Sequence, residues 1–197
     1  MSKVKILCVG PTECGKTVIC NFLADATEVS GGDYRPTQGV RILEFEASGL
    51  TIPGRSSVDV ELWDCSGDKK FEACWPALVQ DAMGVIFVYN PDQANHDEEL
   101  EKWYTFFGSQ QSMKVNGCIV FSHHRPNAPD IVRTELPSPF LKPPKLTAAG
   151  FSKMQKIETN IEDDPESVRI AFNRFLTMIV SALSKHREKE ELNIMNQ

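Results

Sequence analysis

The sequence predicts an α/β fold with a doubly wound, mostly parallel six-stranded sheet and one antiparallel edge hairpin. Three observations predict it. Residues 4–9 read as a short buried strand, and continuous apolar runs occur at 84–89 and 118–121, as expected of parallel strands covered on both faces. Stripes of apolar residues at helical spacing separate these runs, and two further segments alternate apolar and polar residues. Strands that alternate with helices favour a layered sheet.

The first strand, Val4–Val9, ends on Gly10, and the first helix begins near Lys16 and ends near residues 25–27. The two alternating segments follow at 43–47 and 58–62, and a loop rich in Gly, Ser and Pro joins them. We expect this loop to span residues 48–57. A strand with one polar face is typical of an antiparallel edge hairpin.

The second half of the chain contains two more helices and one irregular segment. Leu100, Trp103, Tyr104 and Phe107 form a helical stripe that we assign to the core. Six prolines between residues 123 and 144 predict an irregular loop over 123–150. The last helix begins at Asp164-Pro165, an N-cap followed by proline at the first helical position.

We expect the last helix to fray from residue 185 onward, where charged residues follow one another. The predicted domain covers residues 1–187, and a charged tail covers residues 188–197.

Composition and charge exclude some functions. The net charge is −6, and a protein that neutralises many phosphates needs a basic face, so we expect no nucleic-acid partner. The six cysteines form no CxxC pair, which indicates free thiols in a reducing compartment, with Cys8 and Cys118 buried. The longest apolar stretch, 83–89, is too short for a membrane span, and neither end carries a lipidation motif. We expect a cytoplasmic protein.

One motif carries most of the chemistry. Residues 10–17 match the phosphate-loop pattern G-x-x-x-x-G-K-[ST] in full and lie between a predicted strand and a predicted helix. Such a loop wraps its backbone N–H groups around a phosphate, while the lysine reaches the β- and γ-phosphates and the threonine hydroxyl binds Mg²⁺. A chance match in a glycine turn is the alternative, and the strand and helix flanks disfavour it. The predicted nucleotide-binding residues here are Gly10, Pro11, Thr12, Glu13, Cys14, Gly15, Lys16, Thr17 and Val18.

Two further segments fit a nucleotide site. Asp64 and Gly67 form a D-x-x-G pattern at the end of a strand, where a carboxylate can hold a metal's water shell and the glycine N–H can reach a terminal phosphate. Thr37 lies in the loop before the second strand, where a mobile segment can close over the metal. Either pattern alone is common in ordinary loops. With the phosphate loop present, we predict that Thr17, Thr37 and Asp64 bind Mg²⁺.

Together these motifs resemble those of the Ras-superfamily small GTPases. Residues 5–10, 36–41, 63–73 and 75–78 are similar to the Rab-like GTPases of the intraflagellar transport machinery, and the resemblance covers about residues 3–185. It implies a P-loop small-GTPase fold that binds GTP, GDP and Mg²⁺, with Thr37 in switch I and 64–67 opening switch II. The catalytic residues that it implies are Lys16, Thr37, Gly67 and Asp68. It also implies coiled-coil partners in the intraflagellar transport B complex, in a cilium or flagellum.

The chain departs from the family pattern at two places. Asp68 stands where most members have a glutamine that orients the attacking water, so we expect slow GTP hydrolysis. The base-reading motif N-K-x-D is replaced by the sequence His-His-Arg-Pro at 123–126, so we expect looser base selectivity. His123 and His124 are candidate base contacts rather than a metal pair, and Glu158–Asn160 stands in for the last base loop.

The leading hypothesis is an atypical Rab-like GTP-binding protein whose output is protein association. One alternative is a pseudo-GTPase scaffold that holds nucleotide structurally. A P-loop nucleotide kinase is less favoured, because such enzymes use several arginines and none occurs between Arg55 and Arg125. We also expect Trp75 and Pro76 to lie on the surface as an effector face, whereas Phe71 fits either the surface or the core.

Overall fold

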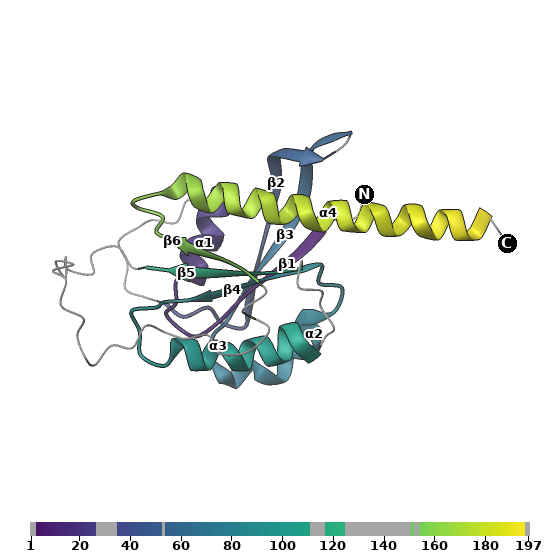
Figure 1. Ribbon diagram of the computed structural model, residues 1–197. Helices are drawn as coiled ribbons and strands as arrows, with labels where there is room; N and C mark the ends of the chain where they lie inside the picture. The colour runs from purple at the N-terminus through teal and green to yellow at the C-terminus, as the bar shows by residue number, and fades with distance from the viewer. Residues whose placement is uncertain are drawn as a thin grey trace.

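The computed structural model describes residues 3–26, 35–52, 54–110, 117–124, 151 and 154–195. All six strands belong to one sheet in the order β2-β3-β1-β4-β5-β6 (Figure 1). Only β2 and β3 pair antiparallel, and the other neighbouring strands are parallel. The predicted fold class is confirmed. The strands are β1 Val4–Val9, β2 Val40–Ile52, β3 Arg55–Cys65, β4 Gly84–Tyr89, β5 Cys118–His123 and β6 Gln155–Thr159.

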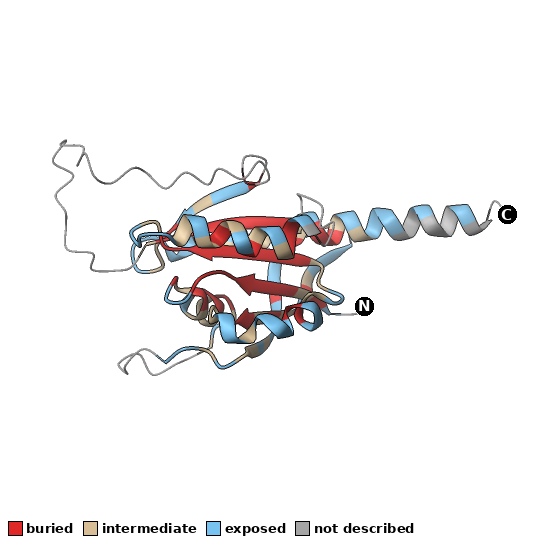
Figure 2. Ribbon diagram, turned by 90° about the horizontal axis from the view of Figure 1, so that it is seen from below, coloured by how far each residue is buried: buried red, intermediate tan, exposed pale blue. Residues whose placement is uncertain are grey.

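Helices cover both faces of the sheet. On one face, α1 and α4 pack on the sheet through Ile19, Phe172 and Phe175. On the other face, α2 and α3 pack through an aromatic cluster that includes Trp103 and Phe107, as the stripe at 100–107 predicted. Figure 2 shows the buried residues in the strands and on the inward sides of the helices. The helical elements are α1 Lys16–Leu23, η1 Lys69–Cys74, α2 Trp75–Val79, α3 His96–Tyr104, η2 Thr105–Gln110 (a π-helix) and α4 Pro165–Met195.

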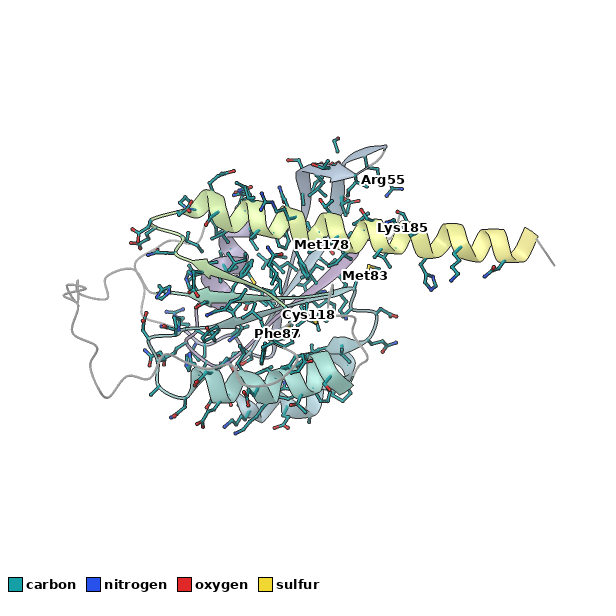
Figure 3. All side chains as sticks on the ribbon, viewed as in Figure 1. Arg55, Met83, Phe87, Cys118, Met178 and Lys185 are labelled. Carbon is teal, nitrogen blue, oxygen red and sulfur yellow. The ribbon has the colours of Figure 1, made fainter. Side chains whose placement is uncertain are left out.

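The core strands are buried as their apolar runs predicted. Cys8 and Cys118 are both buried, and the six cysteines are free thiols. Figure 3 shows Phe87 and Cys118 in the interior, where both belong to the cluster beneath α3, while Arg55 lies at the tip of the β2–β3 hairpin.

The hairpin is longer than predicted. Its strands extend to Ile52 and Arg55, so the predicted loop at 48–57 is wrong. The physical reason is packing against α4: Leu50 is buried in the same cluster as α4, and Asn173 Nδ2 donates to the Ser48 carbonyl oxygen at 3.1 Å. A segment rich in Gly and Ser therefore pairs because a distant helix supports it.

Trp75 was predicted to lie on the surface, and this is wrong. Its side chain is buried, with its ring centroid 4.4 Å from that of Trp103 and 5.2 Å from those of Phe106 and Phe107. The large indole fills the space between α2 and α3. Pro76 is exposed as expected, and Phe71 is partly exposed.

The last helix begins as predicted and ends later. Ser167 N donates to Asp164 Oδ1 at 3.1 Å, which is an N-cap bond. The helix then continues to Met195 instead of fraying from residue 185, and its last turns project beyond the sheet (Figure 1). None of the helices in the described ranges is long and apolar enough to cross a membrane. The predicted irregular loop at 123–150 lies outside the described residues, apart from its first two positions.

Candidate nucleotide-binding site

The predicted phosphate loop connects the end of β1 to the start of α1. Two glycines allow its shape. Gly10 has φ 148°, and a Cβ there would lie 2.0 Å from the Val88 carbonyl oxygen. Gly15 has φ 92°, and its Cβ would lie 2.3 Å from Cδ2 of His123. Side chains at either position would therefore displace the loop from the sheet.

Lys16 lies inside this loop. Its side chain is buried, and Nζ donates to the carbonyl oxygens of Gly10 at 3.0 Å and Pro11 at 2.5 Å. Cys14 Sγ lies 3.6 Å from Nζ, and burial raises the pKa of this thiol. The ammonium group is thus fixed where the loop curls around it. Thr12, Glu13 and Val18 are exposed at the edge of the loop.

Three oxygen-bearing side chains meet beside Lys16, although they come from α1, the segment before β2, and β3. Thr17 Oγ1 donates to Asp64 Oδ2 at 2.8 Å, and Thr37 Oγ1 lies 3.4 Å from the same oxygen. The two hydroxyl oxygens lie 3.1 Å apart. The structure therefore brings together the three residues predicted to bind Mg²⁺.

Asp64 is the charged member of this cluster. It is fully buried, and burial raises its pKa, while the hydrogen bond from Thr17 and the charge of Lys16 oppose that shift. Its Oδ1 atom has no hydrogen-bond partner within the described part of the chain. Buried polar atoms are almost always paired, and Mg²⁺ prefers hard oxygen ligands. The cluster therefore fits a divalent cation.

Gly67 brings the next segment against the phosphate loop. A Cβ at Gly67 would lie 2.5 Å from Pro11 C and Thr12 N, so the two backbones are in contact. This contact leaves the Gly67 backbone beside the loop that would hold a terminal phosphate.

Asp68 is engaged elsewhere. Its carboxylate accepts a hydrogen bond from Lys70 N at 3.0 Å and lies 2.9 Å from Lys70 Nζ. These bonds cap η1 and lower the pKa of Asp68. The side chain that replaces the expected glutamine is thus held at the start of a helix, and it is ionised at neutral pH.

The two histidines occupy different environments, as expected for neighbours on an extended segment. His123 is buried against Gly15, its Nδ1 lies 3.1 Å from Thr159 Oγ1, and burial lowers its pKa to about 4. His124 is more exposed and lies 3.1 Å from both Asp92 Oδ2 and Glu158 Oε2. Among the described residues, no group of three or more His, Cys, Asp or Glu side chains could hold a metal ion.

The chain is similar to known proteins over most of its length. The family model described as "Ras of Complex, Roc, domain of DAPkinase" matches residues 5–124. Intraflagellar transport protein 22 homologues are similar over nearly the whole chain. The homologue of Danio rerio is 47% identical over 99% of this chain and 100% of its own length, and that of Homo sapiens is 43% identical over the same shares. The chain belongs to the intraflagellar transport protein 22 family.

Solved structures of this family agree with the fold. A T. brucei IFT22/74/81 GTP-bound crystal structure matches with a TM-score of 0.67 and 27% identity, covering 94% of this chain and 99% of that one. A T. brucei IFT22 GDP-bound structure matches with a TM-score of 0.64 and 26% identity, covering 92% and 98%. Membership in the intraflagellar transport protein 22 family confirms the Ras-like, Rab-like resemblance. It assigns the chain to intraflagellar transport, the transport process of cilia and flagella. The nucleotide kinase alternative is thereby wrong.

Sequence reasoning missed two contacts of this family member's site. The first is His123, whose ring packs against the phosphate loop. The second is Arg41, whose Nη2 lies 3.7 Å from Asp64 Oδ2 and donates to Asn21 Oδ1. Arg41 faces Asp64 directly across the β2–β3 ladder. Aligning the two alternating segments would have found this pair, because matching Leu43 with Leu62 also matches Arg41 with Asp64.

Proposed function

We propose that the protein binds GTP and GDP together with Mg²⁺ and hydrolyses GTP slowly. In this proposal the GTP-bound protein docks on coiled-coil subunits of the intraflagellar transport B complex. The observation that carries the proposal is the meeting of the Thr17 and Thr37 hydroxyls at Asp64 Oδ2, while the buried Oδ1 of the same carboxylate has no hydrogen-bond partner among the described residues. In the proposed domain, residues 1–187, these three come from separate elements.

The phosphate tail is bound by the loop 10–17. Backbone N–H groups of the loop and the start of α1 carry partial positive charge, which favours a polyanion. Lys16 gives up its carbonyl partners at Gly10 and Pro11 and donates to the β- and γ-phosphates instead. The Gly67 N–H, beside the loop, donates to the terminal phosphate.

The hydroxyl oxygens of Thr17 and Thr37 would hold Mg²⁺, and the Asp64 carboxylate beside them would stabilise its charge. When bound, Mg²⁺ neutralises charge on the β- and γ-phosphates. Thr37 Oγ1 lies 3.1 Å from Thr17 Oγ1, so the segment before β2 brings this hydroxyl to the proposed metal position. In the proposal, a terminal phosphate and its metal ion would stabilise this position of the segment.

Hydrolysis is slow because no described group is placed to orient water. Asp68 is bound to Lys70 at the start of η1, and its carboxylate cannot donate a hydrogen bond as an amide does. Its negative charge also disfavours a second anion nearby. The protein therefore remains loaded with GTP for long periods unless a partner supplies the missing groups.

At the base end we propose that His123 and His124 line the site. His123 is neutral at physiological pH and joins the phosphate loop to Thr159. His124 presents an imidazole between two carboxylates. Base selectivity is looser than in a typical small GTPase, because no carboxylate follows at the position that Pro126 occupies.

The T. brucei relative crystallised as IFT22/74/81 supports protein association as the output. The docked surface includes Thr37, which lies beside Thr17, and the partly exposed Phe71, which follows Gly67 by four residues. Because Trp75 is buried, this surface ends before α2.

A pseudo-GTPase scaffold is the second candidate, and the tether of Asp68 favours it. The two candidates differ in whether partner affinity depends on the nucleotide. Binding of the recombinant coiled-coil partners to GTP-loaded and GDP-loaded protein distinguishes them. Equal affinities would support the scaffold.

Titration with a fluorescent GTP analogue, with and without Mg²⁺, tests the proposed function directly. We expect tight binding by the wild type in Mg²⁺ and a large loss when EDTA removes the metal. A wild-type protein that binds no nucleotide under either condition would overturn the proposal.

A further inference from the structure

Arg41 is the second cationic side chain close to Asp64. It faces Asp64 across the antiparallel ladder, and such directly opposed side chains interact. Its Nη2 lies 3.7 Å from Asp64 Oδ2 and also donates to Asn21 Oδ1 on α1. The predicted metal ligand Asp64 thus has a protein cation beside it.

The two cations near Asp64 are held differently. Lys16 is buried and bonded to two carbonyl groups of the phosphate loop, so it is committed to that loop. The Arg41 side chain is 35% exposed, whereas that of Asp64 is fully buried. An ionised carboxylate is costly to bury unless a positive charge lies close, and the threonine hydroxyls supply none.

Arg41 has a second hydrogen-bond partner, Asn21, that it can keep when a metal ion neutralises Asp64. Asn21 Oδ1 already accepts from the same nitrogen, and the Arg41 side chain is partly exposed to water. The guanidinium group can therefore remain on Asn21 while its attraction to Asp64 is lost. Since like charges repel, a metal ion that enters the cluster meets an unfavourable field from Arg41.

We propose that Arg41 is an internal cation that competes with Mg²⁺ for Asp64. Because of Arg41, the affinity for Mg²⁺ is lower, and nucleotide release is faster, than Thr17, Thr37 and Asp64 would give by themselves. The inference rests on the proposed function, in which Asp64 serves the Mg²⁺ site. It adds a regulatory consequence. When Mg²⁺ leaves, Arg41 still compensates the charge of Asp64, so the free-energy barrier to nucleotide exchange is lower.

The test measures release of a fluorescent GDP analogue from the full chain against free Mg²⁺ concentration set with EDTA. In Arg41→Gln, the Mg²⁺ concentration that halves the release rate should fall about three- to tenfold, as expected for one partly screened charge. Arg41→Lys keeps the charge and should stay near the wild type. Arg169→Gln is the matched control, because Arg169 pairs with Asp25, just after the end of α1.

Two further readouts separate electrostatics from structure. The difference between Arg41→Gln and wild type should shrink at about 0.5 M salt, where charges are screened within a few ångströms. Without nucleotide and in EDTA, Arg41→Gln should melt at a lower temperature than wild type, and this deficit should narrow in Mg²⁺ and GDP.

An unchanged or higher Mg²⁺ midpoint in Arg41→Gln would overturn the inference, as would an equal melting deficit in both conditions. A wild-type protein that binds no nucleotide would remove the proposed function, and this inference with it.

Discussion

The phosphate end and the base end of the site differ in how closely they follow the family pattern. At the phosphate end, Lys16, Thr17, Thr37 and Asp64 are all present and lie together. At the base end, His123 and His124 replace the usual motif, and yet β5 and β6 keep their places in the sheet. A polyphosphate with a divalent cation demands fixed charges at fixed places, whereas several kinds of hydrogen-bonding group can contact a base. Charge therefore constrains the sequence more tightly than base contact does.

The largest effect should come from breaking the phosphate end. Lys16→Ala removes two contacts to charged oxygens, each worth about 1.5–3 kcal/mol, so nucleotide affinity should fall at least about a hundredfold. Fluorescent-nucleotide titration measures this, with Lys102→Ala on the outer surface of α3 as a control that should leave affinity unchanged. Thr17→Asn should also weaken binding, through the metal. Wild-type affinity in both site variants would contradict the assignment of the loop.

A second prediction uses the buried histidine at the base end. His123 has a pKa of about 4 in the fold, against about 6.5 when unfolded, so only the unfolded chain takes up a proton between these values. Stability should therefore fall as the pH drops from about 6.5 to 4, by at most about 3 kcal/mol.

Urea denaturation at several pH values measures that slope. His123→Asn should remove it, whereas His124→Asn, at a more exposed position, should retain it. Parallel pH curves for wild type and His123→Asn would show that the buried ring is not the source.

A third prediction concerns hydrolysis at the phosphate end. The wild-type rate should lie at or below the order of 10⁻⁴ s⁻¹, and Asp68→Gln should raise it about tenfold by restoring an amide that orients water. Single-turnover hydrolysis measures both rates. Glu72→Gln, in the short helix η1 that Asp68 caps, is a matched control that should leave the rate unchanged. A wild-type rate of about one per minute without partners would mean that another group orients the water.

The smallest effect should come from the base end. The affinity for GTP should exceed that for ATP by less than about a hundredfold. The carboxylate that would accept from guanine is missing, and a site without it discriminates weakly. His124→Ala should change that ratio only a few fold, because exposed charged contacts contribute little. Competition binding gives both ratios. Selectivity of several thousandfold would indicate a strong base contact elsewhere.

Local pattern predicted most of the fold and the phosphate end. Apolar runs located the central strands, and an eight-residue motif located Lys16 and Thr17. What the sequence did not reveal depends on contacts between distant segments. The hairpin extends because Asn173 holds Ser48, and Trp75 is buried because three aromatic rings from α3 and η2 surround it. The apolar pattern of a short stretch of sequence carries no information about contacts between distant segments.

The site shows the same division. Asp64 was predicted from its own motif, but its neighbour Arg41 lies 23 positions away and is brought close only by the ladder register. The contact of His123 with Gly15 likewise depends on the packing of β5 beside the phosphate loop. The predicted domain boundary at residue 187 stays a prediction.

The projecting end of α4 affects how the protein can be labelled. Leu183 is the last described side chain of this helix that packs against the core, and the helix continues to Met195. At a rise of about 1.5 Å per residue, a fluorophore or affinity tag attached there sits roughly 18 Å beyond the body. Single-molecule or pull-down experiments can thus immobilise the protein by this end while the nucleotide and both switch segments stay accessible.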